Sequence, residues 1–133
     1  MVILSIDDDA EDIAFFSEAI KQIDPTITYL TASNGEEGLV VLRNTLQLPH
    51  LIFLDINMHI MDGKSCLMEI MKDDRLKRIP VIMYSTTSLA EEIAEYQRLG
   101  AMGFLVKPNE FSSLCRALSE ILTYPRTFMR QCG

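Results

Sequence analysis

The chain has 133 residues, of which 48% are hydrophobic, and its formal net charge is −7. This length and composition predict one globular domain with an ordinary hydrophobic core. Binding to nucleic acid relies on clustered lysine and arginine, so the acidic balance argues against nucleic acid as a direct partner. No apolar stretch approaches the ~20 residues that cross a bilayer, and no signal peptide precedes the first expected strand. We therefore expect a cytoplasmic protein without a membrane partner, whose widely spaced cysteines Cys66, Cys115 and Cys132 stay reduced.

Five short β-prone runs alternate with five helical patterns along the chain. The expected strands cover residues 2–6, 26–31, 51–55, 80–84 and 103–106. Apolar residues at helical spacing mark the segments between and after them, with core-facing stripes at Ile13, Phe16, Ile20 and Ile23; Leu39, Leu42 and Leu46; Leu67, Ile70 and Met71; Leu89, Ile93, Tyr96 and Leu99; and Phe111, Leu114, Leu118 and Ile121. This alternation predicts an α/β fold, with a parallel sheet covered by helices on both faces.

Local signals set the expected ends of several helices. Asn34 with Glu37, and Ser88 with Glu91, have the spacing of capping boxes, and Gly100 suits a helix C-terminus. The charged stretch 73–78 is interpreted as a connector within the domain and not as a domain boundary. We expect one domain over residues 1–123, followed by a C-terminal tail over 124–133.

Polar residues stand at the ends of four expected strands: Asp7 and Asp8, Asp55, Ser85 and Thr86, and Lys107. The carboxyl ends of parallel strands lie on one edge of a sheet, which is where open α/β sheets bind ligands. Neighbouring carboxylates repel each other by ~1 to 4 kcal/mol per pair, and an all-oxygen cluster suits Mg²⁺. A carboxylate nucleophile, a metal site, a hydroxyl and a lysine ammonium are the groups that phosphoryl transfer needs.

Five short motifs carry a resemblance to a known family, and they occur in the family's order: Ile6-Asp7-Asp8-Asp9, Leu54-Asp55-Ile56-Asn57-Met58, Met61-Asp62-Gly63, Tyr84-Ser85-Thr86 and Val106-Lys107-Pro108. Together they resemble the receiver domain of two-component response regulators, and in particular the small stand-alone, CheY-like receivers. The resemblance implies a flavodoxin-like, doubly wound sheet of five parallel strands in the order 2-1-3-4-5, with five flanking helices.

The resemblance also implies roles for individual residues. Asp55 would accept a phosphoryl group from a histidine kinase or phosphotransfer protein, forming an aspartyl phosphate. Mg²⁺ would be bound by Asp7, Asp8, Asp55 and the backbone carbonyl of Asn57. Ser85, Thr86 and Lys107 would contact the phosphoryl group, and Phe104 would be the aromatic switch residue. Asn57 and Thr87 would tune dephosphorylation; since neither is a carboxylate, a phosphorylated state of intermediate or long lifetime is expected.

Several features around the site are specific to this chain. His59 stands where the family usually has proline, and Phe104 stands where tyrosine is frequent. Asp9 falls outside the acid pair and is expected to face solvent, where it can cap the first helix. The resemblance implies a cis Lys107-Pro108 bond. The expected output face comprises the fourth helix, the fifth strand and the fifth helix, with Tyr96, Met102 and Phe104 as contact residues.

Two other functions stay open at this point. One is an aspartyl phosphatase of the haloacid dehalogenase type, although those enzymes usually carry an aspartate where this chain has Asn57. The other is a pseudo-receiver that binds partners without being phosphorylated. On the receiver hypothesis the chain is not an enzyme beyond its own phosphorylation and dephosphorylation. It would then signal through a downstream target protein, with a homodimer as a further option.

Overall fold

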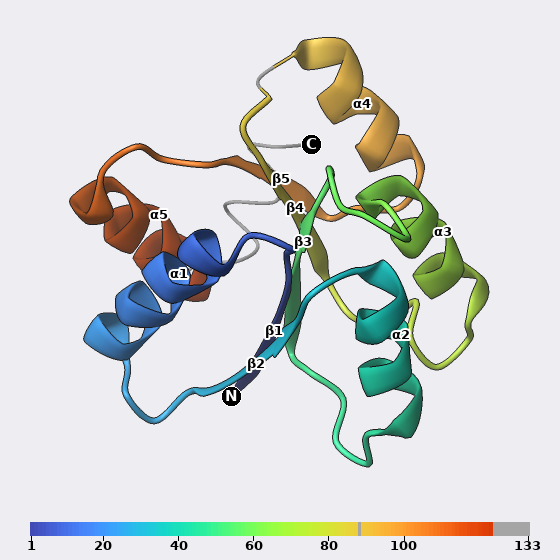
Figure 1. The fold of residues 1–133 in the computed structure, drawn as a ribbon, viewed down its shortest axis with the longest axis horizontal. Coiled ribbons are helices and arrows are strands. Elements are labelled where there is room, and N and C mark those ends of the chain that lie inside the picture. The colour runs from blue at the N-terminus through green and yellow to red at the C-terminus, as the bar shows by residue number, and fades with distance from the viewer. Residues whose placement is uncertain (88, 124–133) are drawn as a thin grey trace.

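A sheet of five parallel strands forms the centre of the molecule (Figure 1). The computed structural model describes residues 1–87 and 89–123. The strands are β1 (Val2–Ile6), β2 (Thr28–Ala32), β3 (Leu51–Asp55), β4 (Val81–Ser85) and β5 (Gly103–Val106). Their spatial order, β2-β1-β3-β4-β5, confirms the predicted doubly wound sheet. Because β3 is the middle strand, Asp55 at its end lies at the centre of the sheet's carboxyl edge.

Helices cover both faces of this sheet. They are α1 (Ala10–Ile23), α2 (Gly35–Asn44), α3 (Gly63–Lys72), α4 (Ala90–Arg98) and α5 (Phe111–Thr123). Figure 1 shows α1 and α5 together on one face and α2, α3 and α4 on the other. Each face has its own core: Phe16, Phe53 and Leu118 belong to the first, and Leu42 and Leu67 to the second. Residues of β1, β3 and β4 are buried throughout, as expected for parallel strands covered on both sides.

Side-chain caps begin three of the helices. Asp9 caps α1 by accepting hydrogen bonds from two backbone N–H groups, which confirms the predicted role. Asn34 Oδ1 accepts from the backbone N–H of Glu37, as the first capping box predicts, and Asp62 caps α3 in the same way. Helix α4 begins after Leu89, whose side chain makes no capping hydrogen bond. The residue predicted to cap this helix, Ser88, lies outside the described residues.

The structure also corrects two predicted element boundaries. Leu46 does not contribute to the core: α2 ends at Asn44, and the Leu46 side chain beyond it is fully exposed. The second strand begins two residues later than predicted. Thr26 is held in a turn because both its N–H and its hydroxyl donate to Asp24 Oδ1, which leaves Thr28 as the first residue of β2.

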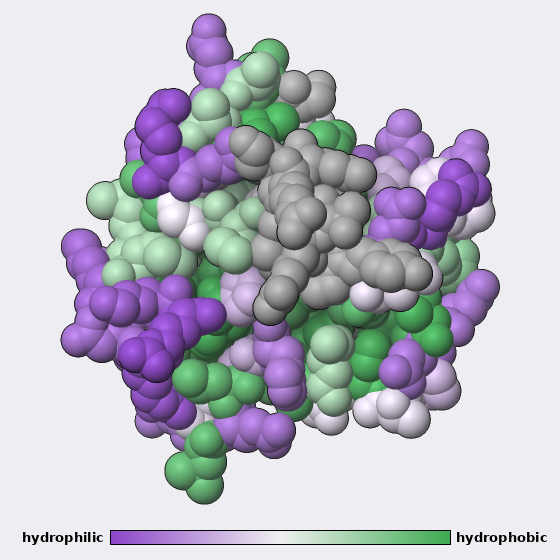
Figure 2. Space-filling view, turned by 180° about the vertical axis from the view of Figure 1, so that it is seen from behind, coloured by the Kyte–Doolittle hydropathy of each residue, from purple (hydrophilic) through white to green (hydrophobic). Residues whose placement is uncertain are grey.

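The stretch from Asp73 to Arg78 connects α3 to β4 within the same domain, as predicted. Figure 2 shows hydrophilic side chains gathered at the left edge of the rear face, over this connection. Arg75 donates from its guanidinium group to the carbonyl oxygens of Leu42 and Thr45 and so caps the end of α2. The Arg75 side chain therefore stabilises the domain itself, so the stretch is not a linker between domains.

Further local features concern the cysteines and the Lys107-Pro108 bond. Cys66 is buried and Cys115 is half-buried, and both are unpaired thiols, whereas Cys132 lies outside the described residues. The predicted cis Lys107-Pro108 bond is wrong: no peptide bond in the described part of the chain is cis, and trans is the intrinsically favoured isomer. Among the described helices, none combines the length and hydrophobicity needed to cross a lipid bilayer.

Candidate functional site

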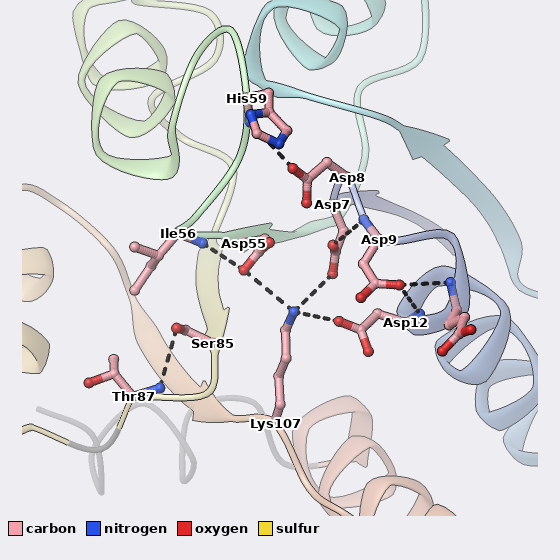
Figure 3. Close-up of polar contacts among 11 residues, drawn as sticks. Asp7, Asp8, Asp9, Asp12, Asp55, Ile56, His59, Ser85, Thr87 and Lys107 are labelled. Carbon is pink, nitrogen blue, oxygen red and sulfur yellow. Dashed lines mark hydrogen bonds and ion pairs between the residues drawn. The ribbon is translucent and has the colours of Figure 1, made fainter.

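Three carboxylates meet at the carboxyl edge of the sheet, as predicted. Asp7 and Asp8 follow β1, Asp55 ends β3, and each offers an oxygen within 4.8 Å of the other two (Figure 3). Asp7 and Asp55 are only 5% and 6% exposed, whereas Asp8 is open to solvent. The cluster therefore has a buried floor and one accessible side.

Lys107, directly after β5, extends into this cluster. Its Nζ lies 2.7 Å from Asp12 Oδ2, 3.2 Å from Asp7 Oδ2 and 3.4 Å from Asp55 Oδ1. The ammonium group also lies 5.2 Å from the centre of the Tyr84 ring beneath it. The backbone N–H of Lys107 donates to the Ser85 carbonyl at 2.7 Å, which fixes the end of β5 against β4. The Lys107 ammonium group thus pairs with three buried or half-buried carboxylates.

Asp12 is a member of the site that we did not predict. It lies in the first turn of α1, and Figure 3 shows its carboxylate directed at the Lys107 ammonium. The sequence contains a signal for it: Asp12 follows the Asp9 cap by three residues. Helical side chains lean towards the helix N-terminus, and here that end faces the strand edge.

Burial and mutual repulsion perturb the site's acidity. Burial, with a further contribution from the Asp7 charge, raises the pKa of Asp55 to about 6, although Lys107 opposes the rise. Burial likewise raises the pKa of Asp7. For Lys107, burial lowers the pKa, but the hydrogen bond to Asp12 and the charges of Asp55 and Asp7 outweigh burial, so that the net shift is upward. The lysine is therefore cationic, while the buried carboxylates lack full charge compensation.

The predicted hydroxyl groups lie at the end of β4. Ser85 is buried, and its Oγ accepts a hydrogen bond from the Thr87 backbone N–H at 3.4 Å, whereas Thr86 is exposed. The Thr87 hydroxyl donates to Glu92 Oε2 at 3.0 Å and accepts from the Leu89 N–H. Thr87 is thus tied to the start of α4.

The loop after β3 closes tightly around Asp55. The Ile56 N–H donates to Asp55 Oδ1 at 2.9 Å, and the Gly63 N–H donates to the Ile56 carbonyl at 2.8 Å. Further along, His59 is exposed, and its backbone N–H donates to Asp8 Oδ2 at 3.3 Å. Asn57 is exposed in the same loop, beside an open hollow that Asp8 and His59 also line.

Ile60, at the tip of this loop, has an unusual backbone. Its φ is +70°, and the Met61 N–H donates to the His59 carbonyl across it at 2.8 Å. This is a strained three-residue turn for a β-branched residue. The Ile60 side chain is exposed, so it makes no contribution to the core in return.

Two of the three predicted contact residues on the output face are buried. Phe104 and Tyr96 are 6% and 5% exposed, with ring centres 6.3 Å apart, whereas Met102 is 47% exposed. Although β5 is an edge strand, α4 packs over the face from which Phe104 projects. The Phe104 ring therefore already lies inward, and of the three residues Met102 alone is open to a partner.

A doubly wound sheet with an acidic cluster and a lysine at its carboxyl edge defines an α/β protein with its site at the strand ends. A family model described as the response regulator receiver domain matches residues 3–119. The chain therefore belongs to the family of response regulator receiver domains of two-component signalling. This membership sets aside the haloacid dehalogenase alternative.

Individual relatives agree with this assignment. A protein-glutamate methylesterase/protein-glutamine glutaminase of Methanococcoides burtonii is 34% identical over 92% of this chain, and the chain spans 34% of that protein's length. The phosphorylated cyanobacterial phytochrome response regulator RcpA has 28% identity and a TM-score of 0.84, covering 93% of this chain and 94% of that one. The Mn²⁺-bound response regulator Rcp1 has 25% identity and a TM-score of 0.81, with 92% of each chain covered.

Proposed function

We propose that Asp55 is the phosphoacceptor of this receiver domain. The observation that carries the proposal is the position of Lys107 Nζ, 3.4 Å from Asp55 Oδ1 at the centre of the carboxyl edge. The donor is a phosphohistidine on a histidine kinase or phosphotransfer protein. A P–O bond to an Asp55 oxygen forms as the P–N bond breaks, and the electron pair of that bond stays on the histidine ring. Similarity to the phosphorylated regulator RcpA supports this chemistry.

Mg²⁺ fits the donor set beside Asp55. The oxygens of Asp7, Asp8 and Asp55 lie within 4.8 Å of one another, and the Asn57 carbonyl is proposed as a further ligand. The raised pKa values of Asp7 and Asp55 show that burial disfavours their charged forms. A bound cation would stabilise these negative charges. Bound there, Mg²⁺ would supply charge neutralisation for the phosphoryl oxygens. The similar regulator Rcp1 binds Mn²⁺, an ion that favours the same oxygen ligands.

The remaining site residues receive and report the phosphoryl group. Lys107 pairs with one phosphoryl oxygen, and the Ser85 hydroxyl, with Thr86 beside it, donates to another. Moving Ser85 towards Asp55 disturbs its contact with the Thr87 N–H and hence the start of α4. The face formed by α4, β5 and α5, with Phe104 beneath it and Met102 on its surface, then changes its affinity for a downstream target or a second copy.

A small phosphodonor tests the proposal. Acetyl phosphate with MgCl₂ should add one phosphoryl mass to the wild-type protein in intact-mass spectra, and none to Asp55→Asn. Wild-type protein that stays unmodified under these conditions would favour the pseudo-receiver, which binds partners without phosphorylation. Equal labelling of Asp55→Asn would show that another residue is the acceptor.

A further inference from the structure

The shortest of the three carboxylate contacts of Lys107 is made by Asp12, a residue outside the acidic cluster. The two are 95 residues apart in sequence, yet Asp12 Oδ2 lies 2.7 Å from Lys107 Nζ, against 3.2 Å for Asp7 and 3.4 Å for Asp55. The lysine side chain is 12% exposed and that of Asp12 34%. The pair is thus half-sheltered from water, which makes it stronger than a pair on the open surface.

The local fold directs the Asp12 side chain towards Lys107. Asp9 Oδ1 accepts from the backbone N–H groups of Glu11 at 2.9 Å and Asp12 at 3.3 Å, so the first turn of α1 is pinned. One turn later, Phe16 anchors the helix in the core. A carboxylate in the first helical turn is also favoured by the helix dipole. Asp12 is therefore held in place by the start of α1.

Lys107 is already shared among three carboxylates. Its ammonium group donates hydrogen bonds to Asp12 and Asp7, and Asp55 Oδ1 lies 3.4 Å from Nζ as an ion pair. A phosphoryl group on Asp55 brings new oxygens that need the same ammonium group. A bond from Lys107 to such an oxygen replaces the ion pair with Asp55, and the phosphoryl oxygens then compete with Asp12 for the same ammonium charge. Asp12 is the contact that takes no part in holding the phosphoryl group.

We infer that Asp12 is a positioning residue that competes with the phosphoryl group for Lys107, and so weakens the phosphorylated state relative to the unphosphorylated one. The inference rests on the proposed function of Asp55. In the resting state Asp12 holds the ammonium group at the rim of the site. After phosphorylation Asp12 and the phosphoryl oxygens compete for the same ammonium group.

Beryllofluoride, which mimics an aspartyl phosphate, measures this competition without catalytic turnover. We would titrate it into full-length protein with MgCl₂ and follow binding by calorimetry and ¹⁹F NMR. Asp12→Asn keeps the side chain's shape but removes its charge, so it should bind beryllofluoride about fivefold more tightly, the scale of one partly exposed ion pair. Asp12→Glu restores a carboxylate and should return the affinity towards the wild-type value.

A matched control separates this pairing from the general loss of negative charge. Glu11→Gln removes a charge from the adjacent, exposed position in the same helical turn. It should change the affinity by less than about twofold, and by still less at about 0.5 M KCl, where long-range effects are screened. The gain in Asp12→Asn should persist at that salt concentration. Thermal unfolding of each variant checks that the fold is retained.

The outcomes are distinct. Tighter binding by Asp12→Asn alone, reversed in Asp12→Glu, supports the competition. Weaker binding, a gain equal to that of Glu11→Gln, or an equal gain in Asp12→Glu would each overturn it while leaving Asp55 as the acceptor. Absence of beryllofluoride binding by the wild-type protein would overturn the proposed function and the inference together.

Discussion

Gly63, the first residue of α3, packs directly against the backbone carbonyl of Asp55, the last residue of β3. A Cβ added at Gly63 would collide with the Asp55 carbonyl oxygen and would lie 2.7 Å from Ile56 Cα. These are backbone atoms at the carboxyl end of the central strand, and they cannot move aside cheaply. The absence of a side chain at position 63 therefore allows the helix to close over the acceptor loop.

Gly63→Ala should consequently destabilise the protein and disturb the site. We expect the free energy of unfolding to fall by about 1 to 3 kcal/mol, the usual range for overpacking, and labelling by acetyl phosphate to slow. Urea denaturation and intact-mass time courses measure the two effects. Ser65→Ala, an exposed position in the same helix, is the control and should behave like wild type. A Gly63→Ala protein of unchanged stability would show that the loop after β3 moves to accommodate the added methyl group.

The acidic cluster predicts a specific response to metal. Mg²⁺ should raise the thermal midpoint of the wild-type protein, by mass action worth about 2.7 kcal/mol at a hundred times the dissociation constant. Asp8→Asn should lose most of this stabilisation and keep or gain stability in EDTA, since one repelling charge is gone. Asp9→Asn retains a capping side chain and should respond to Mg²⁺ as wild type does. If metal-free Asp8→Asn were clearly less stable than wild type, the carboxylate would be structural.

The stability of the metal-free protein should depend on pH through Asp55. Burial raises the pKa of this carboxyl to about 6 from an ordinary 3.8, so between these values the folded state binds more protons than the unfolded state. Stability is therefore greatest below about pH 4 as far as this group is concerned, and it falls as pH rises through about 6. Urea denaturation in EDTA should show a shallower fall for Asp55→Asn. Identical slopes in the two proteins would assign the pH dependence to other groups.

Thr87 bears on the lifetime of the phosphorylated state. Its hydroxyl donates to Glu92, so a glutamate at position 87 would be repelled from α4 and could orient water as a base near the acyl phosphate. Thr87→Glu should therefore shorten the lifetime, roughly several-fold. Loss of the phosphoryl mass after removal of the donor gives the rate, and Thr87→Ser should resemble wild type. An unchanged rate in Thr87→Glu would remove this position from the argument.

Much of the fold was predictable because local pattern and topology agree. The alternation of strands and helices predicted the parallel sheet, and a parallel sheet necessarily brings Asp7, Asp8, Asp55 and Lys107 to one edge. Their presence at one edge followed from the parallel direction of the strands, without any side-chain detail. The family resemblance added the strand order 2-1-3-4-5, which the structure confirms.

The missed features depend on packing that periodicity does not contain. Asp12 looks like an ordinary polar residue of α1 until the fold brings the start of this helix within reach of the Lys107 side chain. Leu46 fits a helical stripe by spacing, but α2 stops at Asn44 before reaching it. Tyr96 and Phe104 are buried by each other and by the packing of α4 on β5. The sequence pattern does not determine how this helix packs on this strand.

The most direct test of Asp55 as acceptor is to identify the modified residue itself. Borohydride reduces an aspartyl phosphate to homoserine, so reduction after treatment with acetyl phosphate and MgCl₂ marks the acceptor permanently. Peptide mapping should find homoserine at position 55, with Asp7, Asp8 and Asp12 unchanged, and omission of the phosphodonor should abolish it. Homoserine at one of the other three aspartates, with Asp55 intact, would contradict the assignment of the acceptor.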